Sequence, residues 1–509
     1  MGMLGTRNCV LTERCFVART STALIWNMAR VIGQSGLGII AMVVLARMLE
    51  REDFGVITMS LVFILFSEIV ASVAFSAAIV QREELTEEHI DSGITMSLIL
   101  ATVFFVLFQL IADPVGEIYN SPVLAEVVKA LTFGMWAMTA SSVFRGLIMR
   151  EMNFRHLMII DFVTYALGIA IVAIVLVYMG WGVWGYVIGT LVWMLTSSIW
   201  LFFSVKRKTR LSLHAKEAKD LFAFGSGVSL NNIINFVTNK SIEAIVGRVM
   251  GMPVLGDYNR ASTTAAIPFQ KIAVTISSVM LVSYSQVQND MQTLRERYFK
   301  AIRLISALSV PVLVGLYASG EYVITGMYGE KWMPAVEVFK ILCIAGILNN
   351  ILHLAGAVVQ ATGQIYREVR RQAFVAMLTL GSVWYAAGFS LEAVGWAYVF
   401  IAFVLYLLMA QLSLSIVGGS WRDYLVAQFP AITISVPVFL ADYAAAQMLA
   451  DYPELSREVG LLVMIGVSGF TYLACLALIP DRWIGGVRTW VMDTYGHRFP
   501  EFIRGYGYW

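Results

Sequence analysis

The sequence predicts an all-α polytopic membrane protein. Of its 509 residues, 59% are hydrophobic and 14% are charged, whereas a soluble domain usually carries about 25% charged residues. Apolar runs of about twenty residues, enough for a helix to span a bilayer, recur along almost the whole chain. These runs lack strand-like alternation, and lipid tolerates only helices or closed barrels as spanning structures. We therefore expect about 14 transmembrane helices.

Lys and Arg divide the predicted loops into two unlike sets. About four fifths of those in loops lie in every second loop and in the two terminal tails, which assigns that side to the cytoplasm. No loop is long enough to form an external catalytic domain, and the chain lacks the G-x-x-x-x-G-K-[ST] phosphate loop of ATP hydrolysis. The four cysteines lack metal-ligand spacing. We therefore expect cytoplasmic termini, no enzymatic activity, no metal site and no nucleic-acid partner.

A segment near the N-terminus recurs in the middle of the chain. In VVLARMLEREDFGVI, residues 43–57, Arg47 ends an apolar run and Gly55 follows eight residues later. Arg248 and Gly256 repeat this spacing at an offset of 201 residues. Further on, VWGYV at 183–187 matches GWAYV at 395–399, an offset of 212. Because an even number of predicted spans separates the copies, we expect two six-helix lobes related by a pseudo-two-fold axis along the membrane normal.

The charged hairpin of the first copy is expected to lie outside the membrane. The segment 50–53 would turn the chain, Arg47 would reach the headgroups, and Gly55 would permit a tight turn before a second span at 56–80. Its counterpart would precede a span at 263–286, so Arg260 would lie in an outer loop.

The repeat accounts for spans 1 to 12, and the last two predicted spans lie outside it. The expected parts are a cytoplasmic N-terminal tail (1–23), an N-lobe with spans 1 to 6 (24–204), a basic cytoplasmic linker (205–223), a C-lobe with spans 7 to 12 (224–416), two extra C-terminal helices (417–479) and a cytoplasmic aromatic and basic tail (480–509).

Polar residues inside the predicted spans indicate a substrate cavity. A charge near the bilayer centre costs about 3 kcal/mol or more and usually faces water. In the first span, Asn27, Arg30 and Gln34 are spaced to share one helical face. The seventh span carries a similar stripe with a lysine beside it: Asn231, Asn235, Asn239, Glu243 and Lys240. The offset of 201 relates the two stripes, so we expect them to face each other across one cavity; the alternative is a hydrogen-bonded seam between packed helices.

Four further charged residues complete the expected site. Arg248 and Lys271 are assigned to the cavity with the two stripes. Glu68 in the second span and Asp161 near the start of the fifth are candidates for coupling to H⁺ or Na⁺, and Glu68 is equally a candidate partner for Arg30. No cofactor is expected beyond such an ion.

Several motifs resemble one known family. They are VVLARMLEREDFGVITM, FSAAIVQREELTEE, RGLIMREMNFRHL, LGDYNRASTTAAIP, YGEKWMPAVEVFKIL and VVQATGQ. In this order they resemble the polysaccharide transport family, the Wzx-type lipid-linked oligosaccharide flippases of the multidrug/oligosaccharidyl-lipid/polysaccharide (MOP) superfamily, and most of all its colanic acid and exopolysaccharide exporters. The resemblance covers roughly residues 20 to 415.

The resemblance implies a V-shaped, MATE-like fold in the bacterial inner membrane, with spans 1 and 7 lining a central cavity. It implies that an undecaprenyl-pyrophosphate-linked repeat unit is turned from the cytoplasmic to the periplasmic leaflet by alternating access, for exopolysaccharide or O-antigen-type lipopolysaccharide synthesis. Membrane lipids and the polymerase and export machinery are the partners it implies. Arg30, Lys240 and Arg248 fit the role of cationic ligands for the pyrophosphate by position.

Three other functions are weighed against this one. A cation-coupled multidrug exporter of the same fold would have an apolar, acidic cavity. A polysaccharide polymerase or ligase would need a long external loop with catalytic Arg or His, which the sequence lacks. A membrane scaffold would not need charges such as Arg30 and Lys240 inside its spans. The sequence does not identify the glycan.

Overall fold

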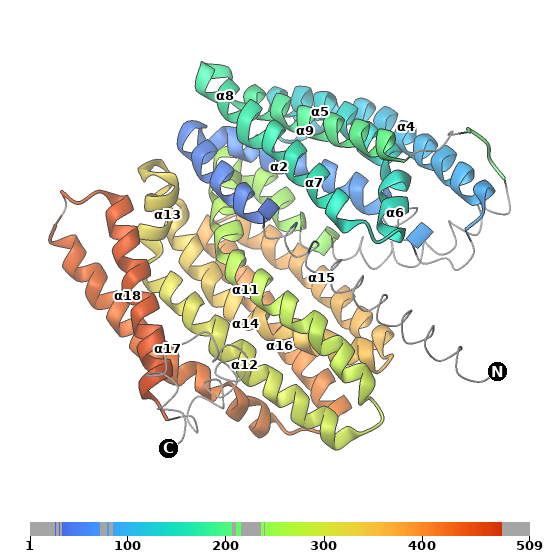
Figure 1. Ribbon diagram of the computed structural model, residues 1–509. Coiled ribbons are helices and arrows are strands. Elements are labelled where there is room, and N and C mark those ends of the chain that lie inside the picture. The colour runs from blue at the N-terminus through green and yellow to red at the C-terminus, as the bar shows by residue number, and fades with distance from the viewer. Residues whose placement is uncertain are drawn as a thin grey trace, which may run out of the picture. The chain divides into compact units, whose positions relative to one another are not determined.

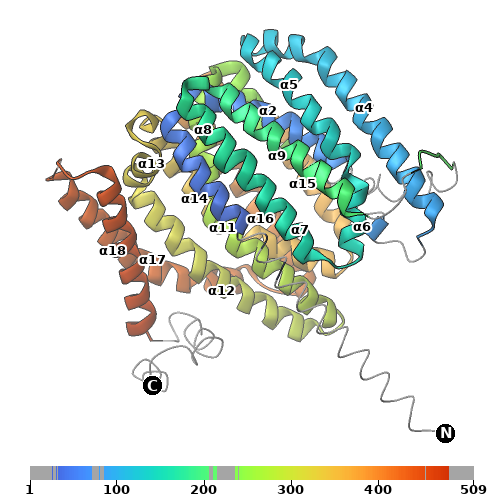
Figure 2. The same ribbon diagram turned by 45° about the horizontal axis from the view of Figure 1, so that its top comes forward.

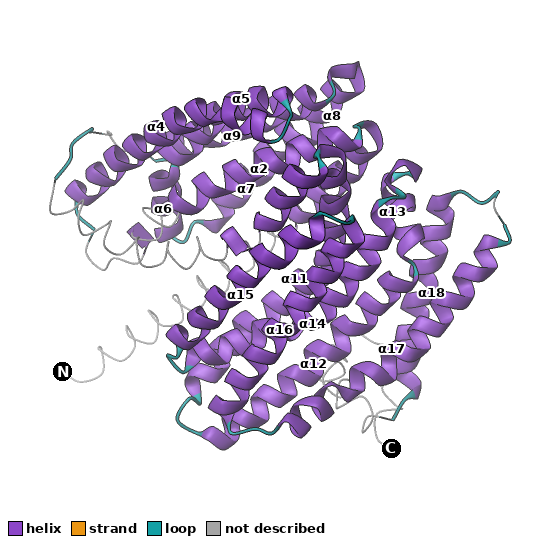
Figure 3. Cartoon of the chain, turned by 180° about the vertical axis from the view of Figure 1, so that it is seen from behind, coloured by secondary structure: helices purple, strands orange, loops and turns teal. Residues whose placement is uncertain are grey.

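The described chain is built from helices. The computed structural model describes residues 26, 30, 33–71, 79–80, 85–205, 210–214, 236–238, 240–452 and 454–480. Within these ranges there are helices and loops and no strand, as Figure 3 shows. Nine of the described helices are long and apolar enough to cross a membrane. The all-α membrane class is therefore confirmed, while the number of about 14 spans stays a prediction.

The chain forms two compact units. Unit 1 comprises Met1–Lys240 and Gly251–Gly256, and unit 2 comprises Ser241–Met250 and Asp257–Trp509. The predicted boundaries of the tails, the lobes and the linker stay predictions, because residues 215–235 and both termini lie outside the described ranges.

Unit 1 is a layered group of helices. Its elements are the helix Gly33–Met48, α2 (Arg51–Ala71), α4 (Glu87–Ile118), α5 (Pro122–Ala140), α6 (Ser142–Arg150), α7 (Phe154–Tyr165), η2 (Ala166–Ala173), α8 (Ile174–Leu176), η3 (Val177–Trp181) and α9 (Val183–Ser204). Helix α5 packs between α4 and α9, which Figure 2 shows side by side. One core cluster joins α4, α6, α7 and α9 around Ile94, Val143, Ile160 and Leu201.

The span from α7 to η3 contains two π-helical stretches, η2 and η3. It lies against α9 through small residues. A Cβ at Gly168 would overlap the carbonyl of Gly189, and one at Gly185 would crowd Val177. Gly185 and Gly189 form a G-x-x-x-G pair, which lets two helical backbones approach closely in lipid. This close packing holds α7, and with it Asp161, in place.

The charged hairpin is shorter than the sequence suggests. Helix α2 begins at Arg51 and not at about residue 56, and the Glu50 amide donates to Asp53 Oδ2 at 3.1 Å, as in a helix N-cap. The expectation of a turn at Gly55 is therefore wrong, because Gly55 lies inside α2.

Gly55 is required by a close helix contact. A Cβ at Gly55 would overlap the backbone carbonyl of Met252, and a Cβ at Gly256 would overlap that of Arg51. Both contacts lie within unit 1. The partners obey the sequence offset of 201, since Arg51 corresponds to Met252 and Gly55 to Gly256. The two copies of the hairpin thus contact each other reciprocally through their repeated glycines.

Unit 2 contains the second set of helices. They are residues 241–250, α11 (Met252–Gln286), of which the first turn belongs to unit 1, α12 (Met291–Ala318), α13 (Gly320–Tyr328), η4 (Glu330–Trp332), α14 (Ala335–Ala361), α15 (Ile365–Ala387), α16 (Leu391–Val417), α17 (Trp421–Ala450) and α18 (Arg457–Leu478). One of its core clusters joins α11, α12, α14, α16 and α17 and includes Tyr298, Leu354, Leu412 and Tyr424.

The two extra C-terminal helices, α17 and α18, pack along α12, as Figure 1 shows in red beside yellow-green. Pro311 lies inside α12 and has no amide hydrogen, so the carbonyl of Ala307, four residues earlier, loses its helical partner. Tyr472 of α18 donates its hydroxyl to that carbonyl at 3.3 Å. Helix α18 thereby satisfies a backbone group that the proline released.

Candidate functional site

Arg30 contacts an acidic residue far away in the sequence. Its Nη1 lies 3.0 Å from Asp161 Oδ2, in the first helix of the fifth predicted span. Four residues before Arg30, the ring of Trp26 lies 5.4 Å from Arg155 Cζ. Both partners, Asp161 and Arg155, belong to α7, so these two contacts hold the side chains of Trp26 and Arg30 against that helix.

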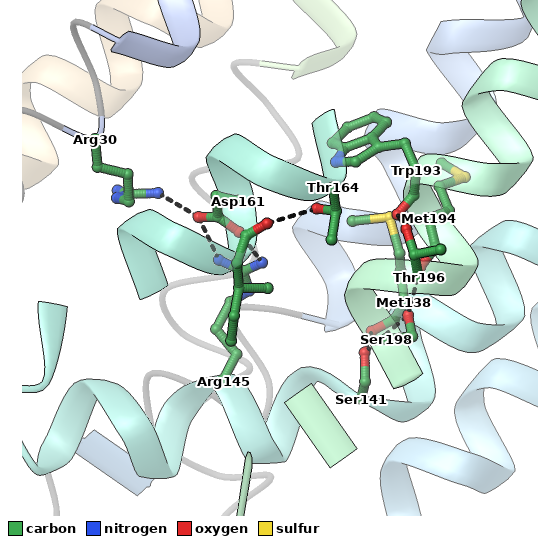
Figure 4. Close-up of polar contacts among 11 residues, drawn as sticks. Arg30, Met138, Ser141, Arg145, Asp161, Thr164, Trp193, Met194, Thr196 and Ser198 are labelled. Carbon is green, nitrogen blue, oxygen red and sulfur yellow. Dashed lines mark hydrogen bonds and ion pairs between the residues drawn. The ribbon is translucent and has the colours of Figure 1, made fainter. Parts of the chain in front are cut away.

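A second arginine completes the group. Arg145 of α6 binds Asp161 as a fork, with Nη2 at 2.7 Å from Oδ1 and Nη1 at 3.0 Å from Oδ2. Figure 4 shows Arg30 and Arg145 reaching the same carboxylate from different helices. We call Arg30, Arg145 and Asp161 the arginine triad.

The arginine triad is positively charged. Two guanidinium groups share one carboxylate, so the three side chains carry a net charge of +1. The carboxylate side chain of Asp161 is 7% exposed, whereas Arg30 and Arg145 are 27% and 28% exposed. The cationic groups thus reach the surface of unit 1 while the anion is buried beneath them. Such a paired arrangement presents Arg forks with fixed orientation, which suits a phosphate or carboxylate ligand.

The remaining predicted residues divide into three groups. Gln34 lies half-buried one turn after Arg30, Lys240 is half-buried, Glu243 is buried and Arg248 is exposed on the helix that ends at residue 250. Lys271 and Glu68 lie within α11 and α2, but their side chains are outside the described set. Four predicted residues fall outside the described ranges altogether: Asn27, Asn231, Asn235 and Asn239.

Unit 2 has a buried polar group of its own near the start of α11. Arg260 was expected in an outer loop, but α11 begins at Met252 and places it two turns into the helix, 4% exposed. Its Nη2 donates to Asn259 Oδ1 at 2.6 Å, and its guanidinium lies 5.8 Å from the ring of Tyr328. Tyr328 in turn shares a 2.8 Å hydrogen bond with Thr264. A cation is therefore buried here against an aromatic ring.

Arg145 is noticeable in the sequence as a charge near the end of the fourth predicted span, but the site prediction does not include it. It lies near the end of the fourth span, where a long basic side chain ordinarily extends to the headgroups. One feature of the sequence indicates that a basic partner exists: Asp161 lies within the next apolar run, and an acid inside a span needs a basic partner. Nothing in the spacing, however, says which arginine provides it.

The fold of this chain is similar to that of solved membrane proteins. Along 92% of its length it matches 99% of a lipid II flippase, MurJ, in an inward closed conformation, with a TM-score of 0.71 and 13% identity. It also matches an inward-facing multidrug resistance MATE family transporter of the MOP superfamily, with a TM-score of 0.60, 16% identity and coverage of 77% of this chain and 97% of that one. The chain thus has the fold of the MOP superfamily, in agreement with the sequence-based expectation.

The sequence comparisons identify the family. A family of polysaccharide biosynthesis proteins matches residues 44–337, more than half of the chain, and the chain belongs to that family. The lipopolysaccharide biosynthesis protein WzxC of Escherichia coli K12 is 25% identical over 85% of this chain and 88% of its own. The succinoglycan biosynthesis transport protein ExoT of Rhizobium meliloti is 24% identical over 73% of this chain and 75% of its own.

Proposed function

We propose that this protein is a flippase that moves a lipid-linked oligosaccharide across a membrane for polysaccharide biosynthesis. Its membership of a polysaccharide biosynthesis family, together with relatives named for biosynthesis and transport of such polymers, carries the proposal. The fold it shares with a lipid II flippase and a MATE transporter supports a transporter. The finer assignment is an undecaprenyl-pyrophosphate carrier lipid turned from the cytoplasmic to the periplasmic leaflet of the bacterial inner membrane, with both termini in the cytoplasm.

The arginine triad is the proposed anion-binding part of the site. Arg30 and Arg145 bind the diphosphate of the carrier, because a guanidinium fork matches two phosphate oxygens and stays charged at any physiological pH. Both oxygens of Asp161 accept from guanidinium groups. We therefore assign Asp161 a positioning role, in place of the ion-coupling role suggested by its sequence position.

The other predicted residues have proposed roles in the same transport cycle. The amides of Asn27, Gln34, Asn231, Asn235 and Asn239 hydrogen-bond sugar hydroxyls, and Lys240, Arg248 and Lys271 add positive charge for the diphosphate. Glu243 balances that charge, and Glu68 remains the proposed site of H⁺ or Na⁺ coupling. Alternating access by rocking of the helical lobes then moves the headgroup, while the prenyl chain stays in lipid.

The test is to find the leaflet in which the lipid-linked oligosaccharide accumulates when the gene is inactivated. Accumulation in the cytoplasmic leaflet is expected, and complementation with Arg30→Ala or Arg145→Ala should fail although both variants reach the membrane. Arg422→Ala, which changes an exposed arginine in the first turn of α17, serves as the matched control and should restore export. Normal leaflet distribution in the inactivated strain, with altered drug sensitivity, would instead favour the multidrug exporter.

A further inference from the structure

A carboxylate lies fully buried between α12, α17 and α18, outside the arginine triad. Asp442 of α17 is 0% exposed. Its Oδ2 accepts a hydrogen bond of 2.6 Å from Ser468 Oγ of α18, and within the described ranges Oδ1 has no hydrogen-bond partner. A Cβ built on Gly315 of α12 would lie 3.1 Å from Asp442 Oδ2 and 3.3 Å from Ser468 Oγ. Three helices therefore close directly on this carboxyl group.

No described cation is positioned to neutralise Asp442. The ion pairs of the surrounding helices lie at their ends: Arg295 binds Asp423 at 2.6 Å, and Arg457 binds Glu321 and Glu330 at 2.9 and 2.7 Å. Lys340 pairs with Glu337. The titratable side chains that flank Asp442 on its own and neighbouring helices are tyrosines, namely Tyr317, Tyr443 and Tyr472.

An ionised carboxylate in this place would be costly. A charge removed from water without a partner costs several kcal/mol, and such a group usually becomes neutral instead. A bound metal cation is a poor alternative, because hard cations take about six or more oxygen ligands. Asp442 and Ser468 supply three oxygen atoms between them. A proton needs only the carboxylate.

A polar pocket lies one helical turn away. Its volume is about 580 Å³, and its lining includes Ala446 of α17, Ala318 of α12 and the ion-paired group of Glu321, Glu330 and Arg457. Ala446 follows Asp442 by four residues and Ala318 follows Gly315 by three, so each lies on the same face of its helix, about 6 Å and about 4.5 Å further along. Ala446 and Ala318 line the pocket on the side of the buried acid, and on α18 the buried Met464 lies one turn from Ser468, between it and the pocket-lining Gly460.

We propose that Asp442 is a proton-binding site, occupied as the neutral acid when α17 and α18 are packed on α12, and that the pocket next to Ala446 is the route by which its proton exchanges with water. The site lies in the two extra helices, outside the duplicated part of the chain. It goes beyond the proposed flippase function and does not depend on it. Deprotonation places a charge in the contact with Gly315 and weakens the packing of α17 and α18.

Infrared spectroscopy of the purified full-length protein tests proton occupancy. The difference spectrum between wild type and Asp442→Asn at about pH 6 should show the loss of a carboxylic-acid C=O band. Ser468→Ala should shift this band without removing it, because the hydroxyl donates to the same group. Asp423→Asn, at an exposed ion pair, should leave the band unchanged. A spectrum in which Asp442→Asn loses only carboxylate absorption would overturn the proposal.

Two further measurements complete the test. Replacing choline chloride by sodium chloride at constant pH should leave the Asp442 band in place. Disappearance of the band would overturn the proposal and indicate that Asp442 binds sodium and not a proton. After transfer to D₂O, Ala446→Leu should slow the isotope shift of the band several-fold. Ala444→Leu, on the exposed face of α17, is the matched control. Equal exchange rates in the two variants would overturn the proposed route.

Discussion

At the residue scale, the arginine triad shows how a sequence reveals a charge without revealing its partner. Arg30 and Asp161 are conspicuous because they interrupt apolar runs. Their pairing joins residues 131 positions apart, and only the packing of the first span along α7 brings them together. The residue pattern along one helix does not tell which side chain of another helix pairs with its charged residue.

The carboxylate of Asp161 should be important for stability as well as for position. Asp161→Asn would leave two guanidinium groups close together and without their shared anion. Removing one partner of a buried pair costs about 3 kcal/mol or more, so we expect a clear loss of thermal stability in detergent.

The matched control for this change is Asp113→Asn. Asp113 pairs with Lys129 at 2.5 Å, but its side chain is 66% exposed. An exposed pair contributes about 1 kcal/mol or less, so this variant should unfold nearly as the wild type does. Equal losses in the two variants would contradict the structural role of Asp161.

At the element scale, helix starts were the least accurate part of the prediction. An apolar run locates the part of a helix inside lipid, but α2 extends beyond it through a charged first turn, and α11 extends beyond it through a segment that carries Asp257 and Arg260. Arg260 was consequently assigned to a loop, and Gly55 to a turn. A glycine fits a turn and a tight helix contact equally well, and only the position of the facing backbone decides between them.

The reciprocal glycine contact makes a prediction about packing. Gly55→Ala and Gly256→Ala each place a methyl group against a rigid backbone carbonyl, so the helices must separate. Both variants should lose thermal stability by about 1–3 kcal/mol, as overpacked sites do. Gly381→Ala in α15, which has nothing within 4 Å of its new Cβ, should be tolerated. Normal unfolding temperatures for all three variants would disprove the contact.

The start of α12 makes a prediction about pH. Asp290 caps this helix, accepting from the Thr293 hydroxyl at 2.7 Å and from its amide at 3.1 Å. These hydrogen bonds, first the one from the hydroxyl, lower the pKa of Asp290 below its ordinary value. The folded state therefore gains stability above the ordinary pKa of about 4, and this gain is lost as the pH falls through the lowered value.

Substitutions at Asp290 separate the contribution of its hydrogen bonds to the cap from the contribution of its negative charge. Asp290→Ala should unfold at a lower temperature than wild type near neutral pH, and the difference should shrink on acidification. Asp290→Asn keeps an acceptor for the amide, so it should retain part of the stability and lose the pH dependence. A difference between Asp290→Ala and wild type that stays constant down to low pH would show that the charge does not contribute.

At the scale of the whole molecule, composition and repeats were the reliable guides. The membrane class followed from apolar run length, and the fold of the MOP superfamily followed from motifs that resembled a family, because both are properties of the whole chain. The sequence does not predict the buried position of Asp442, because a single acid near the end of a span resembles an interfacial residue. Asp442 can be buried because Gly315 of α12 has no side chain and leaves space for the carboxyl group.

The topology of the whole molecule is testable by labelling. In a cysteine-free background, Asn289→Cys and Leu455→Cys place thiols in two exposed loops. A membrane-impermeant maleimide should label Leu455→Cys in intact spheroplasts and Asn289→Cys only after permeabilisation, because Lys and Arg favour the cytoplasmic side. The opposite result would reverse the proposed orientation.

Tyr472 donates its hydroxyl to the Ala307 carbonyl, which Pro311 leaves without a helical partner in α12. This hydrogen bond has a consequence for shortened versions of the protein. A version ending after α16 would retain every element of the duplicated part, yet α12 would then expose a backbone oxygen to acyl chains that offer no donor. The last two helices therefore cannot be removed without cost, and minimal versions of this protein should be designed with them included.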